Sequence, residues 1–219
     1  MVQVTSLVTP YVCPALQIKM HNNQHTTAYG ERGSALDKFI HLIQQSSPSL
    51  KIEQLLECTD DETRDSIERI LKGRTVINSI QSYRKKTENA YYGEELIWKN
   101  FIGRPQFLFE SNESYTVLML KQNSNNHFIH KHVVQMQMYM EILRNLCPDS
   151  EIIGKVGLLD LDKLIAVEER PGILGYALEE RKTFFRIYDH KTNLKRNPTL
   201  CAGIDCAYMG RCEHSGHSK

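Results

Sequence analysis

The sequence predicts an α/β sandwich with a helical N-terminal region and a mixed sheet that one long helix crosses. Three observations support this fold class. Apolar residues recur at helical spacing through most of the first 90 residues. Short β-branched and aromatic runs follow between residues 94 and 121, and helical spacing returns over residues 129–146 before further strand-like runs. This order of helices and strands is typical of a layered α/β domain.

The expected elements can be placed along the chain in order. Residues 1–12 form a short lead, and an amphipathic helix is expected between Gly33 and Gln45. Thr59 and Glu62 fit a capping box for a helix that ends near Gly73, and another helix is expected over residues 76–84. Residues 94–102 are expected as a strand, followed by a hairpin over 105–110 and 115–121. Beyond the helix at 129–146, strands are expected over 151–159, 163–169, 173–178 and 183–189.

Length and composition indicate a single globular domain. The 219 residues are enough for one core, divided into a mainly helical region (15–90), a mixed-sheet core (91–192) and a tail (193–219). The 27 basic and 26 acidic residues give a net charge of +1, so any nucleic-acid surface must be a local patch. No apolar run approaches the ~18 residues of a membrane span, and no export signal is evident. We therefore expect an intracellular protein, in the cytoplasm or nucleus, with no membrane partner.

The cysteines indicate an inorganic centre that joins the two ends of the chain. Cys201, Cys206 and Cys212 lie close together in the tail, and Cys13 lies near the N-terminus. Four thiolates fit an iron–sulfur cluster. A zinc site is equally open from spacing alone, because His214 and His217 could complete a Cys3His set with the tail cysteines. The two remaining cysteines, Cys58 and Cys147, are expected to be small buried hydrophobic residues.

An ordered set of short motifs runs along nearly the whole chain. It comprises Thr9-Pro10 with Cys13-Pro14, Gly33, Gly103-Arg104-Pro105, the segment from Tyr115 to Lys121, Gln135 with Tyr139, and the cysteine trio Cys201, Cys206 and Cys212. This set resembles the RecB-like branch of the PD-(D/E)XK nuclease superfamily that carries an iron–sulfur cluster, whose compact members are the CRISPR-associated adaptation nucleases. The resemblance implies a restriction-endonuclease-like mixed sheet flanked by helices. It also favours a [4Fe–4S] cluster on Cys13, Cys201, Cys206 and Cys212 over zinc.

The sequence departs from this family at the positions that bind metal. The family holds Mg²⁺ or Mn²⁺ with an Asp and a Glu, and here those positions are Gln106 and Met119. The family's His falls on Asp37, whereas the Lys is retained as Lys121. A neutral amide and a thioether cannot offset the dehydration of a hard cation. The resemblance therefore implies a nuclease fold without nuclease chemistry or a Mg²⁺ or Mn²⁺ cofactor.

Other residues are expected to contact nucleic acid. Gln135 and Tyr139 are four residues apart on one helix face, and in the resembled family that face approaches the nucleic-acid backbone. Basic residues that could line a groove for phosphates are Arg84, Lys85, Lys86, Lys195 and Arg196. The expected partners are DNA or protein subunits of a DNA-processing complex. The histidines at the start of the long helix (His127, His130 and His132) are expected to be polar surface residues.

Two alternative functions, each from a different class of protein, remain open. An active metal-dependent DNA exonuclease could take its carboxylates from Asp160, Asp189 and Glu95, with Asp189 and Lys191 on a strand. A zinc-stabilised protein-interaction module would use only the tail ligands and would have no link to nucleases.

Overall fold

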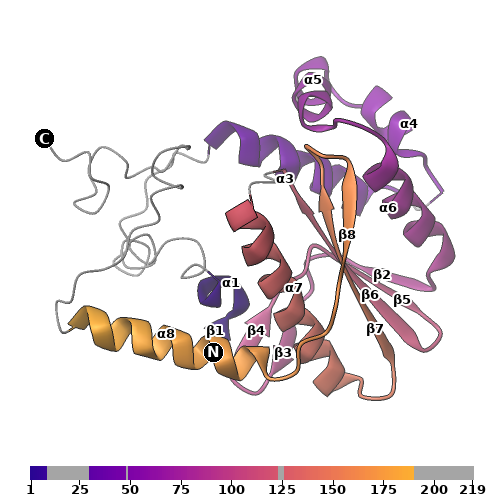
Figure 1. Cartoon of the computed structure of the whole chain (residues 1–219). Helices are drawn as coiled ribbons and strands as arrows, with labels where there is room; N and C mark the ends of the chain where they lie inside the picture. Colours follow the sequence, from indigo (N-terminus) through magenta and orange to yellow (C-terminus); the bar gives the residue numbers. More distant parts are fainter. Residues whose placement is uncertain (9–29, 48, 123–125, 190–219) are drawn as a thin grey trace, which may run out of the picture.

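The computed structural model describes residues 1–8, 30–47, 49–122 and 126–189 (Figure 1). Within these residues the chain forms a mixed α/β structure with two mixed sheets flanked by helices. The predicted α/β class is confirmed at this level. No helix among the described residues is long and apolar enough to cross a membrane.

The larger described sheet has the strand order β2-β5-β6-β7-β8. The predicted hairpin is confirmed as β5 (Phe107–Ser111) and β6 (Ser114–Lys121), which pair antiparallel. β7 (Glu151–Leu158) pairs parallel with β6, and this parallel connection runs through the long helix α7 (Asn126–Leu146). β2 (Asn89–Tyr91) and β8 (Lys163–Val167) each pair antiparallel with a neighbour, at the two edges of the described sheet.

The smaller described sheet has the order β1-β4-β3. β1 (Val2–Gln3) is parallel to β4 (Phe101–Gly103), and β3 (Leu96–Trp98) is antiparallel to β4. The expected single strand over residues 94–102 is therefore wrong, because the chain reverses inside it. The reversal occurs at Lys99, whose φ of 51° lies in the left-handed region of a tight turn.

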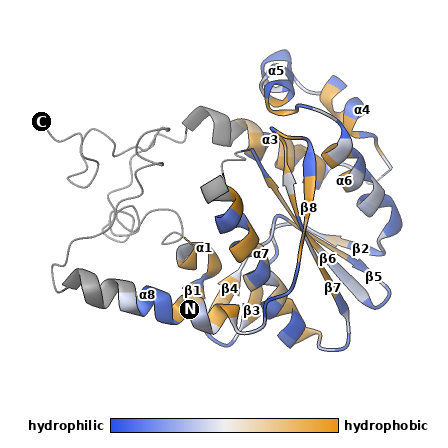
Figure 2. Ribbon diagram, viewed as in Figure 1, coloured by the Kyte–Doolittle hydropathy of each residue, from blue (hydrophilic) through white to orange (hydrophobic). Residues whose placement is uncertain are grey.

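Two layers of helices cover the larger sheet (Figure 1). On one face, α3 (Gly30–Gln45), α4 (Ile52–Glu57), α5 (Asp61–Ile70) and α6 (Thr75–Lys86) form a core with Phe107, Phe109, Leu118 and Leu120. α5 is mainly hydrophilic (Figure 2) and buries only Ile67 and Ile70. On the other face, α1 (Val4–Leu7), α7 and α8 (Ile173–Asp189) pack with Leu108, Val117 and Met119.

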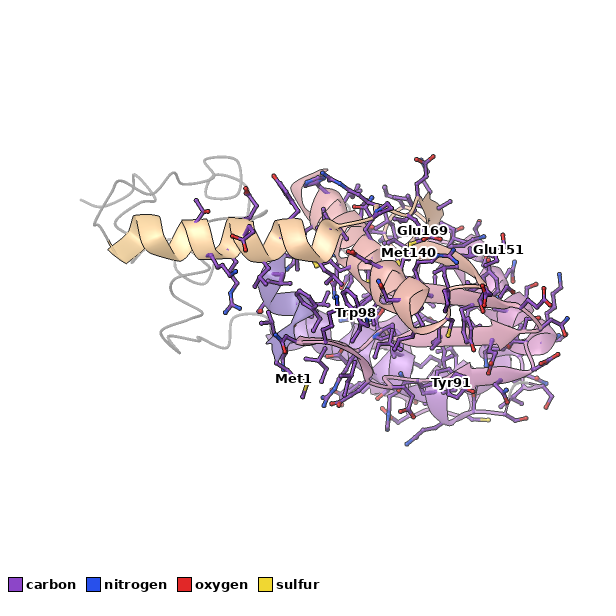
Figure 3. All side chains as sticks on the ribbon, turned by 90° about the horizontal axis from the view of Figure 1, so that it is seen from below. Met1, Tyr91, Trp98, Met140, Glu151 and Glu169 are labelled. Atoms are coloured by element: carbon purple, nitrogen blue, oxygen red, sulfur yellow. The ribbon has the colours of Figure 1, made fainter. Side chains whose placement is uncertain are left out.

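α7 lies close against the sheet because β7 has a glycine beneath it. A Cβ at Gly154 would lie 2.3 Å from the sulfur of Met140 and 2.9 Å from Cγ of Met136. Met136, Met138 and Met140 are all almost fully buried, as expected for packing residues. Met140 is labelled in Figure 3.

The C-terminal described segment differs from the prediction. The two strands expected over 173–178 and 183–189 are instead the single helix α8. The carboxylate of Glu141 on α7 accepts hydrogen bonds from the backbone N–H of Gly172 (2.9 Å) and Leu174 (2.8 Å), which satisfies the first turn of α8. The far end of α8 extends away from the two sheets (Figures 1 and 3).

The predicted capping box at Thr59 was placed one residue too early. The N-cap of α5 is Asp60, whose carboxylate accepts from the N–H of Thr63 at 2.8 Å. Thr59 instead donates its hydroxyl hydrogen to the carbonyl of Leu56. The first turn of α6 is bound by a distant residue, because Asp162 accepts from the N–H groups of Thr75 (2.9 Å) and Val76 (3.1 Å).

Candidate functional site

Three of the positions singled out in the sequence meet on one face of the larger sheet. Side chains alternate along β6, with Leu118 and Leu120 in the core beneath α3–α6 and Met119 in the core beneath α7. By the same alternation Lys121 belongs to the α7 face. Phe107 is opposite Leu118, so the preceding residue, Gln106, comes next to Met119. Gln106, Met119 and Lys121 therefore belong to one corner of the molecule, where β6 leads into α7.

Gln106 has a structural role at this corner. Its side-chain Oε1 accepts a hydrogen bond from the backbone N–H of Leu120 at 2.5 Å. Its backbone carbonyl accepts from Nε2 of Gln44 on α3 at 3.3 Å. The side-chain oxygen thus continues the β5–β6 pairing one residue before the start of β5. It is the only oxygen of the Gln106 side chain, and it is neutral.

Met119 offers no group to a hard cation. Its side chain is 1% exposed and packs in the same apolar cluster as Met136 and Met140. A thioether is a soft ligand, whereas Mg²⁺ and Mn²⁺ prefer carboxylate and water oxygens. The neutral pair Gln106 and Met119 therefore gives this corner no negative charge.

The predicted Gln135–Tyr139 pair makes a direct contact. Nε2 of Gln135 donates to the hydroxyl oxygen of Tyr139 at 2.8 Å, and that hydroxyl donates to the carbonyl of Arg104 at 3.3 Å. Both side chains are buried. Burial raises the pKa of Tyr139, and the bonds to Gln135 and Arg104 act in the opposite direction.

Gly103 explains why the Gly-Arg-Pro segment lies so close to α7. A Cβ at this position would be 2.7 Å from two ring carbons of Tyr139. The Tyr139 ring therefore lies against the backbone of β4, and its hydroxyl reaches the next carbonyl along the chain. Together these contacts fix α7 relative to the segment that carries Gln106.

Basic side chains gather at the same corner. Burial, followed by the positive charge of Lys131, lowers the pKa of Lys121 to about 8, and Asp37 acts weakly in the opposite direction. Burial also lowers the pKa of Lys131. Burial lowers the pKa of His132 to about 3, and the charges of Lys121 and Lys131 contribute. The charges of Lys121 and Lys131 thus act on one another, whereas His132 stays neutral near neutral pH; the three are here called the basic trio.

Sequence reasoning missed Lys131 and misjudged His132. His132 is 7% exposed, so the prediction of a surface residue is wrong for it, whereas His130 is exposed as expected. Lys131, Gln135 and Tyr139 are successive i, i+4 positions, so all three follow one stripe of α7. That spacing was the available signal.

Asp37 lies on the exposed side of α3. Its negative charge acts to raise the pKa of Lys121. Asp37, which holds the position of the family's His, therefore lies near the site. Among the described residues, Asp37 is the carboxylate whose charge acts on the pKa of Lys121.

The basic residues that were expected to line a phosphate groove have different environments in the structure. Arg84 is 3% exposed, and its guanidinium donates to the carbonyl and hydroxyl oxygens of Ser46 at 2.6 and 2.7 Å. This side chain therefore ties α6 to the end of α3. Lys85 and Lys86 are exposed in the last turn of α6. Lys195 and Arg196 lie outside the described residues.

The alternative carboxylates belong to separate parts of the chain fold. Glu95 forms an ion pair with Arg104, Asp160 follows β7 in a turn, and Asp189 belongs to helix α8 rather than to a strand. Lys191 is outside the described residues. Across the described ranges, no group of three or more His, Cys, Asp or Glu side chains is arranged to hold a metal ion.

The predicted cluster ligands Cys13, Cys201, Cys206 and Cys212 all lie outside the described residues, as do His214 and His217. The four-cysteine centre therefore stays a prediction. Cys58 is exposed at the C-terminal end of α4, so the expectation that it is buried is wrong. Cys147 is partly buried just after α7.

Comparison with solved structures gives only distant likeness. No family model and no curated protein sequence matches this chain. Among solved structures, the chain is similar to the one titled "Crystal structure of SSO0001". The two have 13% sequence identity and a TM-score of 0.45, and the alignment covers 98% of this chain and 86% of that chain. Values this low carry no inference about activity.

Proposed function

We propose that this chain is a catalytically degenerate RecB-like nuclease domain that binds nucleic acid or serves as a subunit of a DNA-processing complex of the CRISPR-adaptation type. The observation that carries the proposal is the meeting of Gln106, Met119 and Lys121 at the corner where β6 leads into α7. In the resembled family the corresponding residues are an Asp, a Glu and a Lys. The proposal accounts for three distant sequence positions by one site that keeps its lysine and has lost its acidic ligands.

The chemistry of the two replacements supports lost catalysis rather than altered catalysis. Metal-dependent hydrolysis of a phosphodiester needs a cation to activate water and to stabilise developing charge. Gln106 has its side-chain oxygen bonded to the N–H of Leu120, and Met119 is packed in the core. Removing such electrostatic stabilisation costs several kcal/mol, or roughly three or more decades in rate.

The Gln135–Tyr139 pair is buried and held against the carbonyl of Arg104, so it positions α7 beside the site and does not itself contact nucleic acid. The proposed [4Fe–4S] cluster on Cys13, Cys201, Cys206 and Cys212 would close a loop of nearly the whole chain, which stabilises the folded state by restricting the unfolded one.

The test compares cleavage with binding in the full-length protein. Incubation with single- or double-stranded DNA and Mn²⁺ or Mg²⁺ is expected to give no cleavage, whereas DNA binding persists when EDTA is present. The freshly purified protein is expected to be brown, with iron and no zinc. Manganese-dependent degradation that Lys121→Ala abolishes would overturn the proposal, and one zinc with no iron would favour the interaction module.

A further inference from the structure

β8 is the longest edge strand in the described part of the molecule. It ends the strand order of the larger sheet and has five residues (Figure 1), whereas the edge strands β1, β2 and β3 have two or three. Within the described residues, the backbone of β8 is hydrogen-bonded to β7 and to no other element. The N–H and C=O groups on its outer side therefore remain for another strand.

β8 lacks the features that usually protect an open edge. Such edges are commonly interrupted by a proline or a bulge, or carry charged side chains along their length. β8 contains no proline, pairs with β7 in an unbroken register over all five residues, and has Lys163 as its single charged residue. Ala166 is exposed, and Leu164 and Ile165 are only partly buried. The edge is thus apolar and open to pairing.

The strand is also fixed at both of its ends. Just before it, the carboxylate of Asp162 accepts hydrogen bonds at 2.9 and 3.1 Å from the first turn of α6. Just after it, the carbonyl of Glu168 accepts from Nε2 of Gln137 on α7 at 3.3 Å. Glu169 forms an ion pair with Arg144 of the same helix at 2.6 Å. A strand held in this way loses little conformational freedom when a second strand pairs with it.

We propose that β8 is a dimerisation edge, at which two copies of this chain pair their β8 strands antiparallel. The two larger sheets then become one continuous sheet across a two-fold axis, which is the commonest symmetry of protein dimers. The inference rests on the sheet edge alone, so it is independent of the candidate site and of the proposed function.

The sequence of β8 is compatible with pairing to itself. Outward-pointing backbone groups alternate along a strand, so two antiparallel copies pair only in registers that place one residue opposite itself. With the central residue Ile165 in that position, all five residues of each strand are paired. Leu164 then lies opposite Ala166 of the second copy, and Lys163 lies opposite Val167 of the second copy. The middle of the interface is therefore apolar on both sides.

The charges at the two ends of β8 favour a second copy in the antiparallel direction. Lys163 begins the strand, and Glu168 and Glu169 follow its end. Antiparallel pairing brings the lysine of each copy beside the acidic end of the other, twice by symmetry. Within the described residues, neither Lys163 nor Glu168 takes part in an ion pair. A parallel arrangement would instead bring the two lysines together, which is unfavourable.

The experiment measures the mass of the full-length protein by sedimentation over a range of concentrations. The wild-type mass is expected to rise from 25.3 kDa toward twice that value, with a dissociation constant on the order of micromolar because the paired strands are short. Ala166→Lys places two like charges near each other across the axis, so the dissociation constant should rise about tenfold or more. Asn89→Lys, an exposed position on the opposite edge strand β2, is the matched control and should dimerise as the wild type does.

A complementation experiment separates loss of the contact from loss of folding. Ala166→Glu alone should also weaken the dimer, whereas an equal mixture of Ala166→Lys and Ala166→Glu should form a heterodimer, because the charges across the axis are then opposite. Restored association requires both variants to be folded and their β8 strands to face each other. Failure of the mixture to associate, or a dimer that Ala166→Lys leaves unchanged, would overturn the inference. A wild type that stays monomeric would overturn it too, and would leave this edge to a strand of another protein.

Discussion

At the scale of single residues, the candidate site depends on how closely Tyr139 approaches Gly103. The ring leaves no room for a Cβ on β4, and its hydroxyl links Gln135 to the carbonyl of Arg104. A buried aromatic side chain held by hydrogen bonds at its tip and by backbone contact at its ring has little freedom to move. This contact therefore sets the distance between α7 and the segment that carries Gln106.

Gly103→Ala should destabilise the protein, because the new methyl group would overlap the Tyr139 ring. We expect a loss of about 1–3 kcal/mol in the free energy of unfolding, measured by urea denaturation. Gly175→Ala is the control, since a Cβ there meets nothing within 4 Å in helix α8. The control should be neutral or up to about 1 kcal/mol more stable. Equal stability of the two variants would contradict the close approach.

His132 should make the protein sensitive to acid. Its pKa falls from the ordinary 6.5 to about 3 on folding, through burial and then through Lys121 and Lys131. Between these two pKa values the unfolded chain binds more protons at this residue, so stability rises with pH across that window and is lost on acidification. From about pH 7 to pH 4 the expected loss from this residue is about 2–3 kcal/mol.

The measurement for His132 is urea denaturation of wild type and His132→Gln at both pH values. The substitution removes the titrating group, so the variant should lose less stability than the wild type on acidification. The comparison is made within each protein, because the variant also changes packing at neutral pH. Identical pH dependence in the two proteins would show that His132 is not held in its neutral form.

At the scale of elements, α7 connects the two halves of the described structure. Its first half carries Lys131, His132, Gln135 and Tyr139, and its second half presents Glu141 to the start of α8. The sequence predicted α7 well, since its apolar residues recur over many turns. It did not predict α8, because short apolar runs in a charged segment fit strands and helices alike. The Glu141 carboxylate, far away in sequence, decides between them.

Glu141→Ala should therefore loosen α8 at its N-terminal end. Two backbone N–H groups lose their acceptor, which costs about 1–2 kcal/mol of local stability. Amide hydrogen exchange should become faster over residues 172–177. Glu180→Ala, on the exposed side of the same helix, is the control and should leave exchange in this segment unchanged. Unaltered protection in Glu141→Ala would show that α8 is held mainly by its apolar contacts.

At the scale of the whole molecule, the sequence predicted the α/β class, the hairpin and a long helix that crosses the mixed sheet, but not that β6 and β7 are parallel. It also predicted that the uncharged residues Gln106 and Met119 stand where the resembled family has its two acidic ligands. It could not predict the basic trio, because Lys121 and Lys131 become neighbours only when the end of β6 and the start of α7 pack together. Likewise, the contacts between Asp162 and the first turn of α6 join residues that are 87 and 86 positions apart in the sequence.

The proposed ancestry of the site predicts that its metal affinity can be restored. In the double variant Gln106→Asp, Met119→Glu, two carboxylates should lie beside Lys121, and hard cations bind such oxygen pairs. Mn²⁺ is expected to raise the melting temperature of this variant and not that of the wild type. Calorimetric titration with Mn²⁺ provides a second measurement.

The control for the restored site is the single variant Gln106→Asp, which supplies one carboxylate and should bind Mn²⁺ at least about tenfold more weakly than the double variant. If the double variant folds and still does not bind Mn²⁺, Gln106 and Met119 do not occupy former ligand positions.

The lysine pair at the end of β6 has a consequence for the lifetime of the protein in a cell. Two like charges held together make the empty form open more often, and proteases act on opened chains. A ligand that binds only the closed form lowers the number of such openings. Copies engaged with their ligand would then persist while idle copies are degraded first, so the abundance of the protein would follow the supply of what it binds.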